Sequence, residues 1–209
     1  PPLHEFIPHE PKGQAQLADA LGIDGAELAR RAEQLRETNP MMGHRGVRLG
    51  ITYPEITELQ ARAVLVAAAE LQAEGVAALP EIMVPLTATE AEFVHQDQLV
   101  RHVAREVEAE HGCKLDYLGG TMIEIPRAAL TADEIVSAAD FFSFGTNDLT
   151  QTVFGISRDD AESGFLVHYM EHDVLPANPF ATLDIPGVGK IMRMAVELGR
   201  GVRPDLMIG

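Results

Sequence analysis

Cysteine is almost absent from this chain of 209 residues, which contains one, Cys113. A single cysteine cannot form an internal disulfide, so the sequence favours a reducing compartment, and we expect a cytoplasmic location. Cys113 follows the end of an expected helix, and no motif that supplies a base adjoins it. We therefore interpret Cys113 as an ordinary thiol.

Basic residues are also scarce: 16 Lys and Arg stand against 32 Asp and Glu, which gives a net charge of −16. Such a chain would be repelled by a phosphate backbone, so we do not expect nucleic acid as a partner. No apolar run reaches the roughly 18 residues of a membrane span, and no signal peptide is visible. Because 46% of the residues are hydrophobic, the chain can bury a core. We expect one domain over residues 1–209, or one large piece of a barrel.

Hydrophobic periodicity alternates along the chain between strand and helix patterns. Short apolar runs predict strands at about residues 45–51, 81–86, 119–125, 141–144 and 205–209. Longer segments predict helices at about residues 24–38, 55–74, 87–111 and 188–199, and a capping box predicts another helix start at residues 131–134. Residues 1–11 and the segment after Thr150 show no clear period.

Strands separated by helices indicate a parallel sheet. This α/β pattern fits either an open doubly wound sheet or an arc of an eight-stranded barrel. A sequence that starts in a loop and stops inside an apparent strand favours the arc. The predicted fold is therefore a partial (β/α)8 TIM barrel with parallel strands, truncated at both ends.

The aromatic run at residues 141–144 ends in the sequence Gly-Thr-Asn-Asp, residues 145–148. Glycine lets the backbone come close to a ligand, and Asn147 and Asp148 offer an amide and a carboxylate after the strand. In parallel α/β folds, active sites lie at the carboxyl ends of the strands. The same tetrapeptide is also ordinary turn chemistry, so both interpretations stay open on these residues alone.

A second apolar run, at residues 119–125, carries one carboxylate, Glu124. A charge in such a run is costly unless it is paired or bound to a metal. Successive strand ends would bring Glu124 and Asp148 together, which suits Mg²⁺ held by two carboxylates and by substrate oxygens. The alternative for Glu124 is a salt bridge to an arginine such as Arg127 or Arg158.

Arg45 and two histidines complete the candidates. Arg45 is flanked by small residues and could hold a phosphate or carboxylate with its planar guanidinium, although a lone surface arginine is the alternative. His168 and His172 have a spacing that could bind a metal on a helix, but no third ligand follows at a fixed spacing. We interpret both histidines as surface or packing residues.

Three motifs, at residues 39–46, 120–130 and 142–151, resemble the pyruvate, phosphate dikinase family. Residues 1–6 are similar as well, so the resemblance covers essentially the whole chain. It points to the C-terminal barrel of that family, which binds phosphoenolpyruvate. Phosphoenolpyruvate synthase and the first enzyme of the sugar phosphotransferase system share the Gly-Thr-Asn-Asp motif but match the other stretches less well.

The resemblance implies a kinase of the transferase class with Mg²⁺ as its cofactor. It implies that Glu124 and Asp148 bind both the metal and the substrate. It also implies further substrate-binding residues, namely Arg45, Gly145, Thr146, Asn147 and Arg158.

In the family reaction, phosphoenolpyruvate gives its phosphoryl group to a histidine of a swivelling domain, which passes it to a nucleotide site. The overall products are ATP, phosphate and pyruvate, formed from AMP and diphosphate. The resemblance thus implies phosphoenolpyruvate or pyruvate, the phosphohistidine domain and a second copy in a homodimer as partners.

The family's proton donor is a cysteine in a motif that would begin at about Gly209, and other substrate arginines precede Pro1. Cys113 does not stand in that context. We therefore expect no catalytic acid within this sequence and expect residues 1–209 alone to be inactive.

Two other classes of protein remain as alternatives. A Mg²⁺-dependent lyase barrel that acts on pyruvate-like enolates would also use two acids at strand ends. A structural or dimerisation piece is the second alternative, because the open sheet edge of an incomplete barrel invites pairing.

Overall fold

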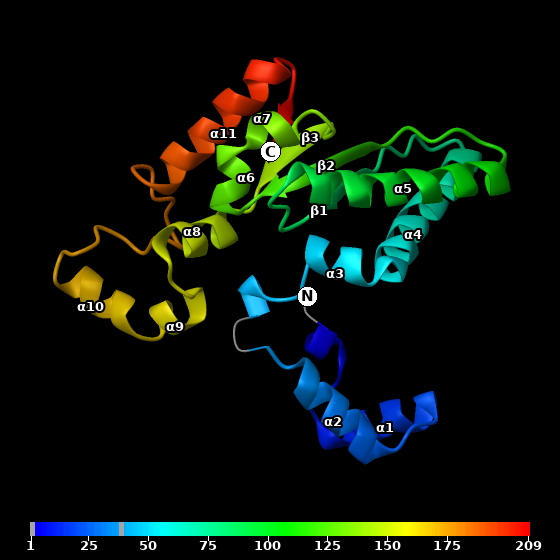
Figure 1. Ribbon diagram of the computed structural model, residues 1–209, viewed down its shortest axis with the longest axis horizontal. Helices are drawn as coiled ribbons and strands as arrows, with labels where there is room; N and C mark the ends of the chain where they lie inside the picture. The colour runs from blue at the N-terminus through cyan, green and yellow to red at the C-terminus, as the bar shows by residue number, and fades with distance from the viewer. Residues whose placement is uncertain (1–2, 38–39) are drawn as a thin grey trace.

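The computed structural model describes residues 3–37 and 40–209, and a parallel sheet lies at its centre (Figure 1). The described residues form four strands, which pair in the order β1 (Glu81–Val84), β2 (Leu118–Ile123), β3 (Phe141–Phe144) and β4 (Met207–Ile208). The register sets Met83 beside Gly120, and Phe142 beside both Thr121 and Ile208. Because every pair is parallel, the segments that follow β1, β2 and β3 all leave the sheet on the same side, where the carboxyl ends of the strands lie; this side is called the carboxyl edge. The predicted α/β class and parallel sheet are confirmed.

Long helices pack beside the sheet. The helices α4 (Pro54–Ala73) and α5 (Glu90–His111) pack on each other, and α11 (Val188–Val202) packs on the short helices α6 (Pro126–Leu130) and α7 (Ala132–Ile135) (Figure 1). α5 begins with a capping box in which Thr89 and Glu92 each accept the other's backbone N–H, and it ends at Gly112 with φ +63°. None of the helices in the described ranges is long and apolar enough to cross a membrane.

Two clusters of buried side chains make up the core. The first joins the sheet to α6, α7 and α11 and includes Ile123, Ile135 and Phe142. The second joins α4 to α5 and includes Leu65 and Val107. These clusters hold the strands in place, and the strands in turn fix where the loops at the carboxyl edge begin.

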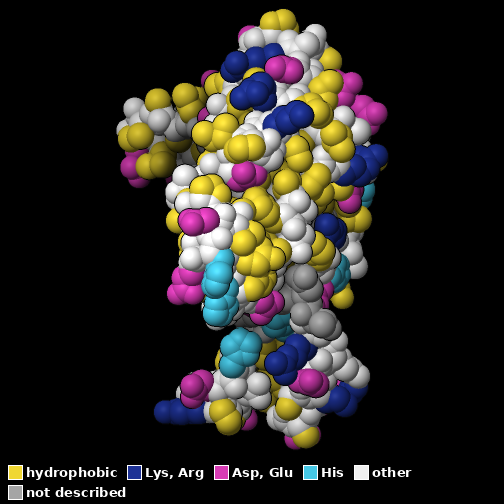
Figure 2. Space-filling model, turned by 90° about the vertical axis from the view of Figure 1, so that its left-hand side faces the viewer, with side chains coloured by type: hydrophobic (Ala, Val, Ile, Leu, Met, Phe, Trp, Pro, Cys, Tyr) yellow, Lys and Arg dark blue, Asp and Glu magenta, His cyan; other side chains and the backbone are white. Residues whose placement is uncertain are grey.

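The N-terminal part of the chain lies below this body. The 3-10 turn η1 (Leu3–Phe6) precedes α1 (Pro11–Leu21) and α2 (Gly25–Leu35), which pack on each other (Figure 1). Figure 2 shows this pair as a lobe below the larger body. The turn η2 (Pro40–Met42) and the helix α3 (Val47–Thr52) then lead back to α4.

The strand predicted at residues 45–51 is wrong, because this segment forms α3. Gly46 adopts φ +57° and ψ −134°, which turns the chain into the helix. Val47 and Gly50 are then buried one helical turn apart. A short apolar run fits a strand and a buried helix equally well, so the pattern alone could not separate them.

Three smaller predictions also needed correction. The segment after Thr150, which was expected to be irregular, continues α8 (Thr146–Phe154) and contains α9 (Arg158–Glu162) and α10 (Phe165–Glu171). Residues 1–11 were expected to be irregular as well, but η1 lies within them; Pro1 and Pro2 fall outside the described residues. Finally, the Thr131 hydroxyl does not cap α7, because it donates to the Arg127 carbonyl instead.

The other predicted elements are found close to their expected positions. The helix expected at residues 24–38 is α2, and the prediction for Thr38 lies outside the described residues. The strands expected at residues 81–86, 119–125 and 205–209 are the shorter β1, β2 and β4.

Candidate functional site

Glu124 follows β2 directly and is buried, with 4% of its surface exposed. The Leu86 backbone N–H donates to Glu124 Oε1 over 2.6 Å. Leu86 lies in the turn after β1 and has φ +57°, a backbone conformation that residues other than glycine seldom adopt. The turn after β1 thus orients the carboxylate that follows β2.

Asp148 lies in the first turn of α8, which begins directly after β3. Its Oδ1 accepts hydrogen bonds from Asn147 Nδ2 at 3.2 Å and from Gln151 Nε2 at 3.3 Å. The Asp148 carboxyl group also lies near enough to Glu124 to raise the Glu124 pKa. The structure therefore brings together the two acids that the order of the strands predicted to be neighbours.

The environment raises the pKa of Glu124 to about 7. Burial is the largest cause, because it disfavours the charged carboxylate, and the neighbouring Asp148 carboxyl group adds to it. The Leu86 N–H and the Arg45 charge oppose this rise. It is therefore unfavourable for both acids to be charged at once unless a cation is bound beside them.

Gly145 connects β3 to α8 and packs against the Glu124 side chain. A Cβ at this position would overlap Glu124 Oε2, and it would lie 2.6 Å from Met122 Sδ and 2.7 Å from Glu124 Cβ. Real Cβ atoms do not approach other atoms so closely. The glycine of the Gly-Thr-Asn-Asp motif therefore makes room for the neighbouring acid.

Arg45 lies between η2 and α3 and is half-buried, near enough to Glu124 for its charge to lower the Glu124 pKa. The next two residues fix this loop against the turn after β1. Val47 N donates to the Pro85 carbonyl over 3.0 Å, and a Cβ on Gly46 would lie 2.9 Å from the same oxygen. The structure thus places a positive charge near Glu124.

The predicted alternative for Glu124, a salt bridge to Arg127 or Arg158, is not found among the described ion pairs. Arg127 Nη1 donates to the Ala88 carbonyl over 2.6 Å. Arg158 donates to Glu162 and to Asn147. Arg158 thus contacts the loop of the site rather than the buried acid.

The two carboxylates fit a divalent cation. A cation between them would neutralise like charges that burial and proximity otherwise disfavour. Across the described residues, no group of three or more His, Cys, Asp or Glu side chains could hold a metal ion by itself. The remaining ligands of Mg²⁺ would then be water and substrate oxygens, as is usual where this ion works on phosphates.

The other sequence candidates lie away from this site. Cys113 precedes the amino end of β2 and packs against the α4 and α5 cluster, whereas Glu124 follows the carboxyl end. The His168 and His172 rings are 6.5 Å apart and tilted, and His172 Nδ1 contacts the His168 carbonyl. Both histidines are exposed, which agrees with their interpretation as surface residues.

Sequence reasoning missed several polar groups of the site. Gln151 is buried and uses both ends of its amide, since Nε2 donates to Asp148 and Oε1 accepts from Arg158 N at 2.8 Å. Its position one helical turn after Asp148 is a signal that could have been used. Leu86 N and Asn178 gave no such signal, because they reach the site from loops distant in the sequence, and Glu162 lies in the short helix α9, which was not predicted.

Comparison with known proteins identifies the class. Residues 10–204 match the family described as PEP-utilising enzyme, PEP-binding domain, and the chain belongs to this family. Over its whole length the chain is 53% identical to pyruvate, phosphate dikinase 1, chloroplastic, from Arabidopsis thaliana. It is 52% identical to the pyruvate, phosphate dikinases of Giardia intestinalis and Clostridium symbiosum. It spans 22% to 24% of the length of these relatives.

Proposed function

We propose that residues 1–209 bind phosphoenolpyruvate or pyruvate together with Mg²⁺, as the substrate-binding part of a pyruvate, phosphate dikinase. The observation that carries this proposal is the pair of neighbouring acids, Glu124 and Asp148, which follow successive parallel strands at the carboxyl edge of the sheet, with Arg45 near Glu124. Membership in a PEP-binding family and the dikinase names of the relatives support this choice of substrate and reaction.

Each side chain of the proposed site has a role that follows from its chemistry. Glu124 and Asp148 would hold the cation, which when bound stabilises negative charge that develops on the substrate oxygens. Arg45 would neutralise the phosphate or carboxylate of the substrate. Gly145 and Thr146 would form the loop under the substrate, and the Asn147 amide would donate to it. Such positioning and charge neutralisation are most of what phosphoryl transfer asks of a protein.

The full reaction involves partners outside this chain. We propose that the phosphoryl group is exchanged with a histidine of a swivelling domain, and that the longer protein forms a homodimer. The predicted cytoplasmic location stays a prediction, since the Arabidopsis relative is named as chloroplastic.

We also propose that the sheet is an arc of a TIM barrel. The strand order β1-β2-β3-β4 follows the sequence without reversal, whereas a doubly wound sheet reverses its order at a switch point. The sheet described here is open, with β1 and β4 at its edges.

A binding experiment tests this function. We expect the ³¹P NMR signal of phosphoenolpyruvate to shift and broaden on adding the protein with Mg²⁺, and to change little without Mg²⁺. The Arg45→Met variant should bind phosphoenolpyruvate about tenfold more weakly, since a charge-assisted contact is worth about 1.4 kcal/mol or more.

Arg36→Met is the matched control, because Arg36 is exposed and lies after α2 with its guanidinium 3.9 Å from Glu33. This control should bind phosphoenolpyruvate like the unaltered protein. Binding that is independent of Mg²⁺, or equal weakening by both variants, would contradict the proposed site.

The alternative of an enolate lyase predicts no exchange of phosphate between phosphoenolpyruvate and a histidine, and a purely structural piece predicts no phosphoenolpyruvate binding at all. The relatives compared above are all named as dikinases, which favours the phosphotransferase.

A further inference from the structure

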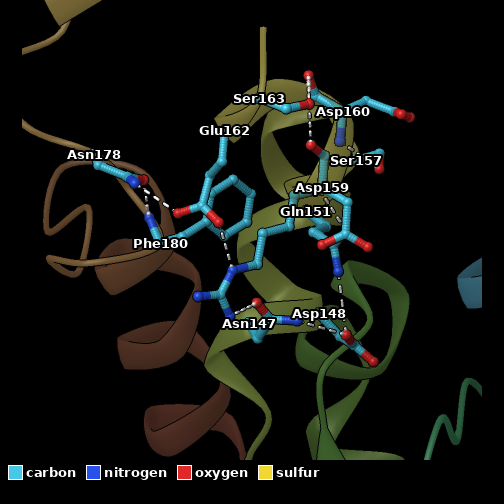
Figure 3. Close-up of polar contacts among 11 residues, drawn as sticks. Asn147, Asp148, Gln151, Ser157, Asp159, Asp160, Glu162, Ser163, Asn178 and Phe180 are labelled. Carbon is cyan, nitrogen blue, oxygen red and sulfur yellow. Dashed lines mark hydrogen bonds and ion pairs between the residues drawn. The ribbon is translucent and has the colours of Figure 1, made fainter. Parts of the chain in front are cut away.

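A chain of polar contacts leads from the Asn147 side chain to the loop after α10 (Figure 3). Arg158, the first residue of α9, donates from Nη1 to Asn147 Oδ1 over 3.1 Å. The same guanidinium donates from Nε to Glu162 Oε2 over 2.9 Å. One arginine thus joins the proposed substrate loop to a carboxylate at the end of α9.

Glu162 is itself fixed from its other side. Asn178 Nδ2 donates to Glu162 Oε1 over 2.7 Å, and Asn178 Oδ1 accepts from Phe180 N at 2.9 Å. This turn sets the Phe180 ring against the guanidinium, with Arg158 Cζ 5.8 Å from the ring centroid. In Figure 3 the Glu162 carboxylate lies between Asn178 and the rest of the network.

An exposed pair of one acid and one arginine would contribute little, because water screens it and ordering two long side chains costs entropy. The Arg158 and Glu162 side chains are 45% and 32% exposed. Here, however, both oxygens of Glu162 accept hydrogen bonds. The Arg158 guanidinium donates from two of its nitrogens, and its Cζ lies over the Phe180 ring. Such a network restricts the rotation of every member more than an isolated pair would.

The consequence falls on Asn147. An amide oxygen that accepts from Arg158 forces the amide nitrogen to point the other way, and Asn147 Nδ2 is 3.2 Å from Asp148 Oδ1. Asn147 therefore presents its N–H donors, and not its oxygen, on the side of the two acids. Donors on that side suit an anionic substrate.

We propose that Glu162 is a positioning residue, which holds Arg158 so that Arg158 fixes the orientation of the Asn147 amide toward the substrate. This inference rests on the proposed function for its substrate, phosphoenolpyruvate. Glu162 itself would not contact the substrate. Its effect should therefore appear in phosphoenolpyruvate binding and not in Mg²⁺ binding.

The first test measures both affinities in Glu162→Ala. We expect the affinity for phosphoenolpyruvate, in the presence of saturating Mg²⁺, to fall about tenfold, the equivalent of 1.4 kcal/mol. The affinity for Mg²⁺ alone should stay within about twofold, because Glu124 and Asp148 are unchanged. Glu162→Gln should lose less, because its one remaining oxygen can still accept from Arg158 or Asn178.

Glu171→Ala is the matched control. The Glu171→Ala change removes the same charge from the neighbouring helix α10. There the Glu171 carboxylate lies 3.6 Å from His168 Nδ1 in an exposed pair. It should leave both affinities unchanged. Equal losses in Glu162→Ala and Glu171→Ala would show a general charge effect and would overturn the positioning role.

The second test reads Asn147 without substrate. The ¹H–¹⁵N signals of its carboxamide, assigned through their loss in Asn147→Ser, should move in Glu162→Ala and stay in Glu171→Ala. Backbone amide signals of β2 and β3 should stay in place in all variants, which shows that the fold is kept. If the carboxamide signals do not move in Glu162→Ala, the positioning role is overturned, whether or not the unaltered protein binds phosphoenolpyruvate. If the signals move but the unaltered protein does not bind phosphoenolpyruvate, the result counts against the proposed function alone.

Discussion

At the scale of single residues, the close packing of Gly145 gives a steric prediction. Gly145→Ala would place a methyl group against Glu124 Oε2 and Met122 Sδ, so the acid or the loop must shift. Such overpacking typically costs about 1 to 3 kcal/mol, and we expect a loss of this size in the free energy of unfolding by urea.

Gly201→Ala is the control for this change, since no atom lies within 4 Å of a Cβ at Gly201 in α11. It should stabilise the protein by up to about 1 kcal/mol, because alanine favours a helix over glycine. If Gly145→Ala unfolded at the same urea concentration as the unaltered protein, the close packing of Gly145 on Glu124 would be wrong.

The raised pKa of Glu124 predicts how the free energy of unfolding depends on pH. Its pKa is raised from 4.5 to about 7 in the fold, so the folded state favours the protonated acid. Without Mg²⁺, the contribution of Glu124 to stability is therefore greatest below pH 4.5 and is lost as the pH rises through about 7. Because Glu124→Gln cannot ionise, its free energy of unfolding should fall less over this range than that of the unaltered protein.

Urea unfolding at about pH 5 and about pH 8, with a chelator present, measures this difference. Parallel changes in the two proteins would mean that Glu124 titrates in the fold as it does in the unfolded chain.

The sequence could predict the pairing of Glu124 with Asp148 because each acid follows one of two successive parallel strands. It could not predict Leu86, whose N–H reaches Glu124 from 38 residues away through a strained turn. Glu162 and Asn178 were missed for a related reason, since their contact depends on how the irregular segment after α10 folds back.

At the scale of elements, the two threonines that precede α5 and α7 should behave differently. Thr89 accepts the Glu92 N–H in a complete capping box, so Thr89→Ala should lower the free energy of unfolding by about 1 kcal/mol. The Thr131 hydroxyl donates to the Arg127 carbonyl and does not cap α7, so Thr131→Ala should cost less. Thermal unfolding of the two variants compares them directly, and an equal or larger loss for Thr131→Ala would contradict the assignment of the caps.

Long helices were predicted well and short helices poorly. Helices α4 and α5 run for 20 and 22 residues, and a period of 3.6 is clear over such lengths. Helices α9 and α10 have 5 and 7 residues, too few for a period to appear. For the same reason, the segment that forms the 6 residues of α3 was predicted to be a strand.

At the scale of the whole molecule, the alternation of strands and helices was enough for the class but not for the closure of the sheet. A barrel arc and a doubly wound sheet share that alternation and differ in the order of strands, which depends on contacts between distant segments. The order in the structure follows the sequence and leaves β1 and β4 at open edges. What the fold achieves for function is to place Arg45, Glu124 and Asp148, from three separate segments, at one edge of the sheet.

The proposal that Glu124 and Asp148 together bind Mg²⁺ is tested by calorimetric titration of Mg²⁺ into the unaltered protein, Asp148→Asn and Asp133→Asn. Asp133 is exposed on α7 and controls for the loss of one charge. We predict that Asp148→Asn binds Mg²⁺ at least about tenfold more weakly, since it removes one of two charged ligands, while Asp133→Asn binds it like the unaltered protein. Equal affinity in all three proteins would show that Asp148 does not bind the metal and that the proposed Mg²⁺ site is wrong.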